Sequence, residues 1–441
     1  MNKLLVRKCA LIGILLINSS AWSGPWDIAT SPLFLAKTAD PLITLIWDDS
    51  GSMLVEKTPE STDYANFAYP VFFSDADYYA VATYGSGTNS KMVRDPKQNP
   101  LFFDPFKTYK PWINADGTLM ANATATSLWK SPLQTHPDDQ YTQNNSSCKK
   151  MNLTSSSTTM CYTYTQCNSF SRCSYNKNPS FTPGNFYYDG KAYSLKNTTT
   201  NYATGFFYSG SPAITAVNMR NNAANWYTYY RDRKNTGKAA LSYALQDIPE
   251  NIKIGFTTFS YAKENPSSPL LFSHAKYTGS NKQKLFDAFF KEDNAGATYM
   301  REAVLNVNNY IKNTNSLWYD GTVPLSCQRA YNIVISDGGW TDGSISFSKN
   351  SDGTAGTQIT GPNNRKYTYS STASDSYPDT YSGTFADIAM EFWKTDLRSD
   401  LANNLTAPDG FKNQAFWQHI VTNGISLNDN IPADIPTSWP N

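Results

Sequence analysis

The segment PLITLIWDDSGSM, residues 41–53, decides the fold of this chain. Its first part, 42–47, is apolar almost throughout, which is typical of a strand buried on both faces of a parallel sheet. The polar turn Asp48-Asp49-Ser50-Gly51-Ser52 follows it directly. In an open α/β sheet, ligands bind at the carboxyl ends of the strands. The segment therefore predicts a buried strand with a candidate site at its end.

Helical and strand patterns alternate in the second half of the chain. We expect helices at 222–245, 282–291, 300–311 and 385–396, and strands at 251–260, 331–335 and 416–427. With the first strand, the order β-α-β-α-α-β-α-β is typical of a parallel sheet with helices on both faces. The sequence therefore predicts an α/β fold of Rossmann type with a mostly parallel sheet.

A long insertion, at about 54–220, separates the first strand from the other elements. It is aromatic and rich in Ser, Thr and Asn, and it shows no sustained helical period, so we expect an irregular region of short strands, turns and loops. Loops held on a rigid sheet commonly carry recognition. We therefore expect binding specificity in this insertion.

The first 23 residues are typical of a secretory signal peptide. Basic residues precede a short apolar run at 10–17, and small residues stand at 21 and 23, so cleavage is expected near Gly24. The apolar run is too short for a comfortable membrane span. We expect an exported chain, peripheral to the membrane, that consists of residues 24–441.

Export would place the cysteines in an oxidising compartment, where disulfides are the default. Cys148, Cys161, Cys167 and Cys173 cluster in the insertion, whereas Cys327 stands apart. Their spacings contain no C-x-x-C pair, so a zinc site is not predicted. Four cysteines allow three pairings, of which we predict Cys148–Cys161 and Cys167–Cys173.

The composition excludes several classes of protein. The 441 residues include 11 Trp, 23 Phe and 29 Tyr, enough to bury a large core, which excludes a disordered chain. The 37 basic residues are balanced by 36 acidic ones, so no nucleic-acid partner is expected. The three histidines leave little material for His-based zinc sites or proton transfer.

Three loops together predict a metal site. Asp48, Ser50 and Ser52 form a D-x-S-x-S pattern, Thr298 ends a G-A-T segment before a helix, and Asp337 follows the strand at 331–335. Carboxylate and hydroxyl oxygens suit hard cations such as Mg²⁺ and Mn²⁺. Taken alone, the first loop is equally typical of a polar turn that caps a helix.

The three loops, in this order, resemble the metal-ion-dependent adhesion site of von Willebrand factor A domains. The resemblance implies that Ser50 and Ser52 coordinate the ion directly and that Thr298 does so directly or through water. Asp48 and Asp337 would hold metal-bound waters or orient the hydroxyls. The ion, Mg²⁺ before Mn²⁺ or Ca²⁺, would keep an open position for a partner's carboxylate. The whole of 24–441 would then be one A-like domain, interrupted by the insertion.

Longer strings resemble the secreted, tip-associated adhesins of type IV pilus systems, the PilY/PilC-type pilus biogenesis proteins. The strings are 31–53, NPLFFDPFKTYKPW at 99–112, ANWYTYYRDRKNTGKAAL at 224–241, SCQRAYNIVISDGGWTDG at 326–343, FADIAMEFWKTDLR at 385–398 and FWQHIV at 416–421. The resemblance implies secretion through the inner membrane to the periplasm, cell surface and pilus tip, with minor pilins as partners. Such proteins also carry a C-terminal β-propeller with a calcium loop, so the chain is expected to match their N-terminal domain alone.

Three functions remain open on the sequence. The first is a metal-dependent adhesin that binds a carboxylate on a host cell, matrix or other surface. The second is a scaffold that primes the pilus with minor pilins, with metal only stabilising it. A metal-assisted or serine hydrolase is disfavoured, because the chain has no G-x-S-x-G elbow and no histidine in a recognisable catalytic pattern. We therefore predict no enzyme and no catalytic residue.

Several other polar and aromatic residues have a structural interpretation. We expect Arg231 and Arg233 on a solvated helix face rather than in an anion site. The aromatic string at 226–230 is expected to pack against the sheet and the insertion rather than to bind sugar. His419 is expected to be a packed or edge residue.

Overall fold

The computed structural model describes residues 39–54, 95–97, 99–129, 131–135, 152–153, 158–159, 162–168, 171–177, 180–181, 185–188, 191–194, 216–292, 296–372, 378–406, 413 and 415–427. The predicted signal peptide at 1–23 lies outside these residues. Cys148 and Cys161, which carry one predicted disulfide, also lie outside them.

A five-stranded sheet in the order β15-β12-β1-β8-β9 forms the centre of the fold. Its strands are β1 (Leu42–Trp47), β8 (Lys253–Thr258), β9 (Phe272–Lys276), β12 (Ala330–Ser336) and β15 (Ile420–Ser426). β1 pairs in parallel with β12 and β8, and β12 pairs in parallel with β15. Only β9 is antiparallel within this sheet. The predicted α/β fold with a mostly parallel sheet is therefore confirmed.

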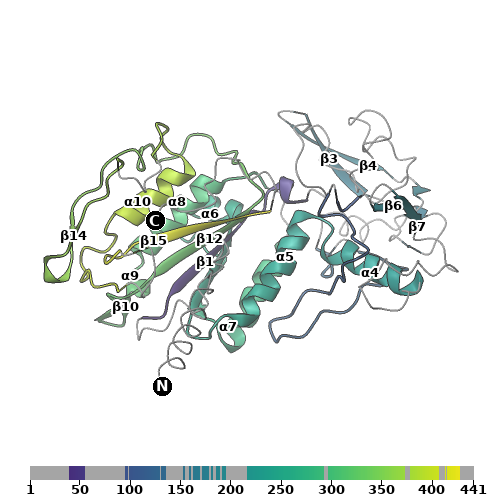
Figure 1. Cartoon of the computed structure of the whole chain (residues 1–441), viewed down its shortest axis with the longest axis horizontal. Coiled ribbons are helices and arrows are strands. Elements are labelled where there is room, and N and C mark those ends of the chain that lie inside the picture. Colours follow the sequence, from purple (N-terminus) through teal and green to yellow (C-terminus); the bar gives the residue numbers. More distant parts are fainter. Residues whose placement is uncertain are drawn as a thin grey trace, which may run out of the picture.

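Helices cover both faces of this sheet (Figure 1). The helices of the described residues are α4 (Ala216–Tyr229), α5 (Arg233–Ala244), α6 (Phe259–Glu264), α7 (Gly279–Lys291), α8 (Met300–Asn313), α9 (Asn315–Trp318) and α10 (Phe385–Lys394). Of these, α4 lies on the far side of α5 from the sheet (Figure 1). On one face, α6, α8 and α10 pack against Leu42 and Ile46 of β1. On the other, α5 and α7 pack against Leu45 and Trp47. The alternating side chains of β1 thus serve two hydrophobic cores, as a central strand must.

The predicted helix at 222–245 is wrong as a single element. The structure has two helices, and the break falls at Tyr230–Asp232. Asp232 caps the second helix, because its carboxylate accepts a hydrogen bond from Asn235 N. This short polar side chain competes with continued helix and starts a new one.

Two strands have boundaries that differ from the sequence prediction by two residues or more, and one strand was not predicted. The strand expected at 251–260 ends at Thr258, whose hydroxyl caps α6 by accepting from Tyr261 N. The last strand begins at Ile420 rather than Phe416, because 415–417 pack as a separate aromatic cluster. The antiparallel edge strand β9, which was not predicted, is only half-buried and lacks an apolar run.

The described part of the insertion consists of loops and short hairpins. The pairs are β2 (Thr158–Thr159) with β5 (Ser180–Phe181), β3 (Tyr162–Asn168) with β4 (Ser171–Lys177), and β6 (Asn185–Tyr188) with β7 (Lys191–Ser194). In the β3–β4 register, Cys173 stands opposite Gln166 and Cys167 opposite Arg172. The disulfide pairings stay predictions, whereas Cys327 is a half-buried free thiol.

The loop at 99–112 packs onto α4, α5 and α7. Trp112 is buried, stacks on Phe290 at 5.1 Å between ring centroids and donates from Nε1 to Tyr229 O at 2.9 Å. Trp226 lies 5.0 Å from the ring of Phe102. The prediction that the aromatic string at 226–230 packs against the insertion is therefore confirmed.

Two short strand pairs lie in the loops of the α/β part, β10 (Tyr319–Asp320) with β11 (Val323–Pro324) and β13 (Ile359–Thr360) with β14 (Lys366–Tyr367).

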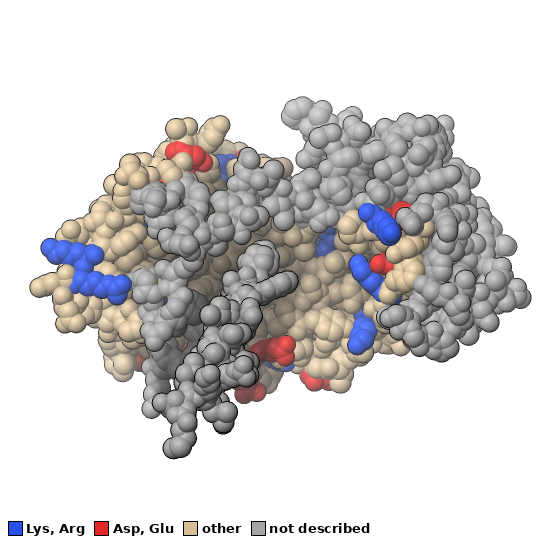
Figure 2. Space-filling view, viewed as in Figure 1, with Lys and Arg blue, Asp and Glu red and all other residues tan. Residues whose placement is uncertain are grey.

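In Figure 2, basic side chains appear at the left edge and right of centre, with acidic ones among the latter group. None of the helices in the described part of the chain has the length and hydrophobicity that a membrane span requires.

Candidate metal centre

The candidate site begins where β1 and β12 end side by side. Trp47 is paired with Ile335 at the last position of the β1–β12 ladder, and Asp48 N donates to Ile335 O at 2.9 Å. Because the two strands are parallel, the turns after them leave from the same edge of the sheet. The sheet register therefore places the loop at 48–52 beside the loop that follows Ser336.

Asp48 is buried and joins these two loops. Its Oδ1 accepts from Ser50 N at 2.9 Å, and its Oδ2 accepts from Ser336 Oγ at 2.6 Å. Burial, together with the negative charge of Asp337, raises the pKa of Asp48 from 3.8 to about 6. The charge of Asp337 thus lies close enough to oppose the ionisation of Asp48, and this arrangement favours a cation between or beside the two carboxylates.

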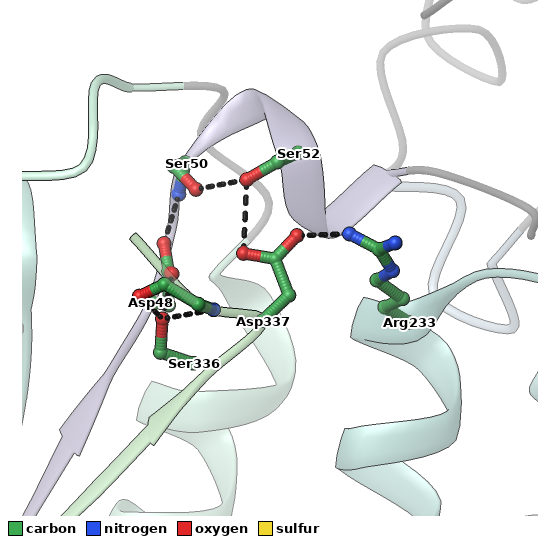
Figure 3. A network of polar contacts seen from close by, with 7 residues as sticks. Asp48, Ser50, Ser52, Arg233, Ser336 and Asp337 are labelled. Carbon is green, nitrogen blue, oxygen red and sulfur yellow. Dashed lines mark hydrogen bonds and ion pairs between the residues drawn. The ribbon is translucent and has the colours of Figure 1, made fainter. Parts of the chain in front are cut away.

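Two serine hydroxyls continue the network toward Asp337 (Figure 3). The hydroxyl oxygens of Ser50 and Ser52 lie 2.9 Å apart. Ser52 Oγ donates to Asp337 Oδ1 at 3.0 Å. Ser52 sits on a short 3₁₀ turn, η1 (Gly51–Leu54), whose Met53 is buried beneath it and anchors the turn. Four of the five predicted metal-site residues therefore belong to one connected group.

The fifth, Thr298, is held beside this group by its backbone. Ser50 and Gly296 form a parallel bridge, in which Gly51 N donates to Gly296 O and Gly296 N donates to Asp49 O. Thr298 is buried, and its own N–H donates to Thr341 Oγ1 at 3.0 Å. The loop at 296–298 thus contacts the loop at 48–52 and the loop that follows Asp337. All three predicted loops lie together.

Gly296 has a steric reason to be glycine. A Cβ at this position would lie 2.2 Å from Ser260 Oγ. Ser260 N in turn donates to Asp49 Oδ1 at 3.1 Å. Burial raises the pKa of Asp49, while the charge of Lys234 acts in the opposite direction. Asp49 therefore positions the start of α6, which backs the loop at 296–298.

Arg233 belongs to the site, and its predicted place on a solvated helix face is wrong. Its guanidinium is 0% exposed and donates to Asp337 Oδ2. The same carboxylate accepts from Ser52 on its other oxygen. Arg231 is also buried, and its guanidinium lies 4.0 Å from the ring centre of Tyr227. Neither arginine therefore lies on a solvated helix face, since Arg233 is buried at the start of α5 and Arg231 is buried in the break before it.

The donor set fits a small, hard divalent cation. Its hydroxyl oxygens and carboxylates are the ligand types that Mg²⁺ and Mn²⁺ prefer. Among the described residues, no three His, Cys, Asp or Glu side chains gather as a metal site would require. A cation here would therefore depend on Ser50, Ser52 and Thr298, backed by the two carboxylates.

Sequence reasoning missed Ser336 and Arg233. Ser336 was visible in the sequence as the residue before Asp337, and its hydroxyl donates to Asp48 Oδ2 and accepts from Gly338 N. Arg233 had no clear signal, because a charged residue near a helix start is usually solvated. Only the break at Asp232, which turns Arg233 toward the site, would have indicated it.

The chain is similar to the Type IV pilus biogenesis factor PilY1 of Pseudomonas aeruginosa. PilY1 proteins from two strains are 25% identical to it over 95% of this chain, and that of a third strain is 23% identical over 99%. The chain spans only about a third of the length of these curated relatives, 34–35%. No family model matches the chain, and no solved structure does. The resemblance to PilY-type proteins predicted from the sequence is confirmed.

Proposed function

We propose that this chain is a secreted, type IV pilus-associated adhesin and assembly factor with a von Willebrand A-like domain. It binds surface ligands through a metal-ion-dependent adhesion site at the ends of β1 and β12. The similarity to PilY1 supports the pilus association. The mostly parallel sheet with helices on both faces is compatible with the A-like fold.

One observation carries the adhesion proposal, the contact of Ser52 with Asp337 across two strand ends. It brings the hydroxyls of the first loop to the carboxylate of the last one. Ser50, Ser52 and Thr298 would hold the cation, while Asp48 and Asp337 orient the hydroxyls. A bound cation would supply electrostatic attraction for a carboxylate of a host-cell, matrix or surface ligand.

The same similarity supports a proposal for the cellular location and the partners. We expect export through the inner membrane, followed by residence in the periplasm, at the cell surface or at the pilus tip. Minor pilins would be the partners there.

A priming scaffold, in which metal only stabilises the fold, is the second candidate. The relatives' name, a biogenesis factor, favours an assembly role. One observation argues against a metal that only stabilises the fold. Hydrogen bonds already connect the loops, from Ser336 to Asp48 and from Ser52 to Asp337. The loops therefore have protein contacts that hold them without an ion.

A hydrolase stays disfavoured. Of the described histidines, His274 bonds to Thr44 and His419 to Trp417 O, and burial lowers the pKa of each to about 4. Neither is bonded to Ser50 or Ser52, so neither activates them as a nucleophile. Ester or peptide turnover that disappears in Ser50→Ala would overturn this conclusion.

Cells that carry Ser52→Ala test the proposal, with exported protein levels and folding checked first. The adhesin proposal expects normal piliation and lost binding to surfaces, matched by wild-type cells treated with a chelator. Unchanged binding would contradict it. Lost piliation in this strain, with the protein folded and exported, would show instead that the site serves assembly and would exclude a merely stabilising metal.

A further inference from the structure

Arg233 holds the carboxylate that the candidate metal site needs. It is the first residue of α5, directly after the capping residue Asp232. Its guanidinium donates to Asp337 Oδ2, and Ser52 donates to Asp337 Oδ1. Figure 3 shows the guanidinium and the serines on opposite sides of this carboxylate. The carboxylate of Asp337 therefore contacts both the positively charged Arg233 and the candidate metal ligand Ser52.

The charges around the site do not cancel once a divalent ion binds. Asp48 and Asp337 carry two negative charges, and Arg233 carries one positive charge that it cannot lose. Asp49 and Lys234 lie nearby but have opposite charges that offset each other. With a divalent cation the group would carry one net positive charge. The same group without Arg233 would be neutral.

Burial strengthens the electrostatic effect of this excess charge on a bound ion. The Arg233 side chain is 0% exposed and that of Asp337 is 5% exposed, so little water screens them. Charges interact several times more strongly in such surroundings than in bulk water. The N-terminus of α5 adds a further partial positive charge on the same side. An ion that enters the site would therefore be repelled by the buried positive charge of Arg233.

We propose that Arg233 couples cation binding to anion binding at this site. Without an acidic ligand, the positive charge of the guanidinium beside Asp337 repels the divalent ion and keeps the affinity of the site for the ion low. A ligand carboxylate offsets the excess positive charge, so ion and ligand bind together more tightly than either alone. The inference rests on the proposed adhesion site, and it restricts the ligand to anionic groups, excluding neutral sugars.

Three variants distinguish the effect of the charge of Arg233 from the effect of its hydrogen bond to Asp337. Arg233→Gln removes the charge but keeps a donor for Asp337, whereas Arg233→Lys keeps the charge. Lys238→Gln is the matched control, because Lys238 is a buried cation of the same helix whose Nζ donates to Phe290 O instead. Thermal unfolding would first establish that each variant is folded.

Free Mn²⁺ is then measured by electron paramagnetic resonance during titration, in sodium chloride and in sodium acetate of equal ionic strength. We expect Arg233→Gln to bind Mn²⁺ about tenfold more tightly than the wild type in chloride. Acetate should strengthen the binding of Mn²⁺ to the wild type, Arg233→Lys and Lys238→Gln. It should change the Mn²⁺ affinity of Arg233→Gln much less.

The outcomes distinguish the inference from the site itself. Wild-type binding with equal or weaker binding in Arg233→Gln would overturn the role of Arg233 and leave the metal site standing. Tighter binding in Lys238→Gln as well would overturn it too, by showing that any lost charge suffices. No saturable binding by any folded variant, with or without acetate, would overturn the proposed site and the inference together.

Discussion

Arg233 and Asp337 form a buried ion pair between residues 104 positions apart in the chain. Arg233 begins α5, on the side of the molecule that carries the insertion, and Asp337 follows β12 of the central sheet. The pair thus connects the helix that packs against the insertion to the loop that carries the candidate metal site.

Asp337→Ala should destabilise the fold by about 3–5 kcal/mol, because it removes the carboxylate beside a buried guanidinium. The combined variant Arg233→Met, Asp337→Ala should lose much less than the sum of its single changes. Urea unfolding of the wild type, the two single variants and the double variant measures this coupling. Strictly additive losses would show that the two side chains do not act as a pair.

Gly296→Ala should destabilise the protein by about 1–3 kcal/mol and weaken cation binding. The added methyl group would lie 2.2 Å from Ser260 Oγ, so that hydroxyl must rotate away or the loop of Thr298 must move away from Ser50. Thermal unfolding and Mn²⁺ titration check both effects. Gly343→Ala is the control, because no atom lies within 4 Å of a Cβ there.

Removing the Ser260 hydroxyl, which the new methyl group would contact, gives a sharper version of the same test. Ser260→Ala combined with Gly296→Ala should recover much of the lost stability, since the nearest remaining contact of the new Cβ would be Ser260 Cβ at 3.5 Å. Failure of this double variant to recover would mean that Gly296 is required for some reason other than the contact with Ser260.

Part of the acid sensitivity of the fold should come from His274. Burial and, less strongly, the charge of Lys253 lower its folded-state pKa to about 4, below its ordinary 6.5. The unfolded chain therefore binds more protons between these values, so stability is full above pH 6.5 and falls toward pH 4. At pH 5 the loss from this residue should be about 2 kcal/mol relative to pH 7.

His274→Gln isolates that contribution. Glutamine can keep the hydrogen bond to Thr44, which the imidazole makes at 3.0 Å. Asp48 acts in the opposite direction, since its raised pKa favours the folded state at low pH. The difference between wild type and variant, measured by urea unfolding at pH 7 and pH 5, removes this background. Equal pH dependence in both would contradict the assignment to His274.

Trp112→Ala should destabilise the fold by about 3–5 kcal/mol, as truncation of a buried tryptophan does elsewhere. Its ring stacks on Phe290 and its Nε1 bonds to Tyr229 O, so the change detaches the loop at 99–112 from α5 and α7. Trp340→Ala is the comparison, because that tryptophan is 45% exposed. Similar losses for the two variants would show that the loop adds little to the core.

The sequence predicted the sheet well because its strands are short apolar runs with polar turns at their ends. β1 and β12 have this pattern, and both were expected within about a residue of their observed ends. β9 lacks it, because an edge strand contacts solvent and its sequence FSHAK has no continuous apolar face. The helix break at Asp232 was missed because helical periodicity continues across it.

The candidate site was predictable only in part. Ser50, Ser52 and Asp337 follow strands, and parallel pairing was enough to expect them together. Arg233 comes from a helix that packs beside the sheet, and no spacing in the sequence specifies which of its charged residues faces inward. Tertiary packing decides this, so the ion pair with Asp337 required the structure.

The most direct test of the central claim is a calorimetric titration of Mg²⁺ and Mn²⁺ into the purified protein, repeated with the Asp48→Ala, Ser52→Ala double variant shown to be folded. The ions are titrated with and without acetate, since an acidic ligand is expected to support binding. We predict saturable binding by the wild type that is lost in the double variant. A folded wild type that binds neither ion under either condition, or a double variant that binds as well as the wild type, would contradict the account.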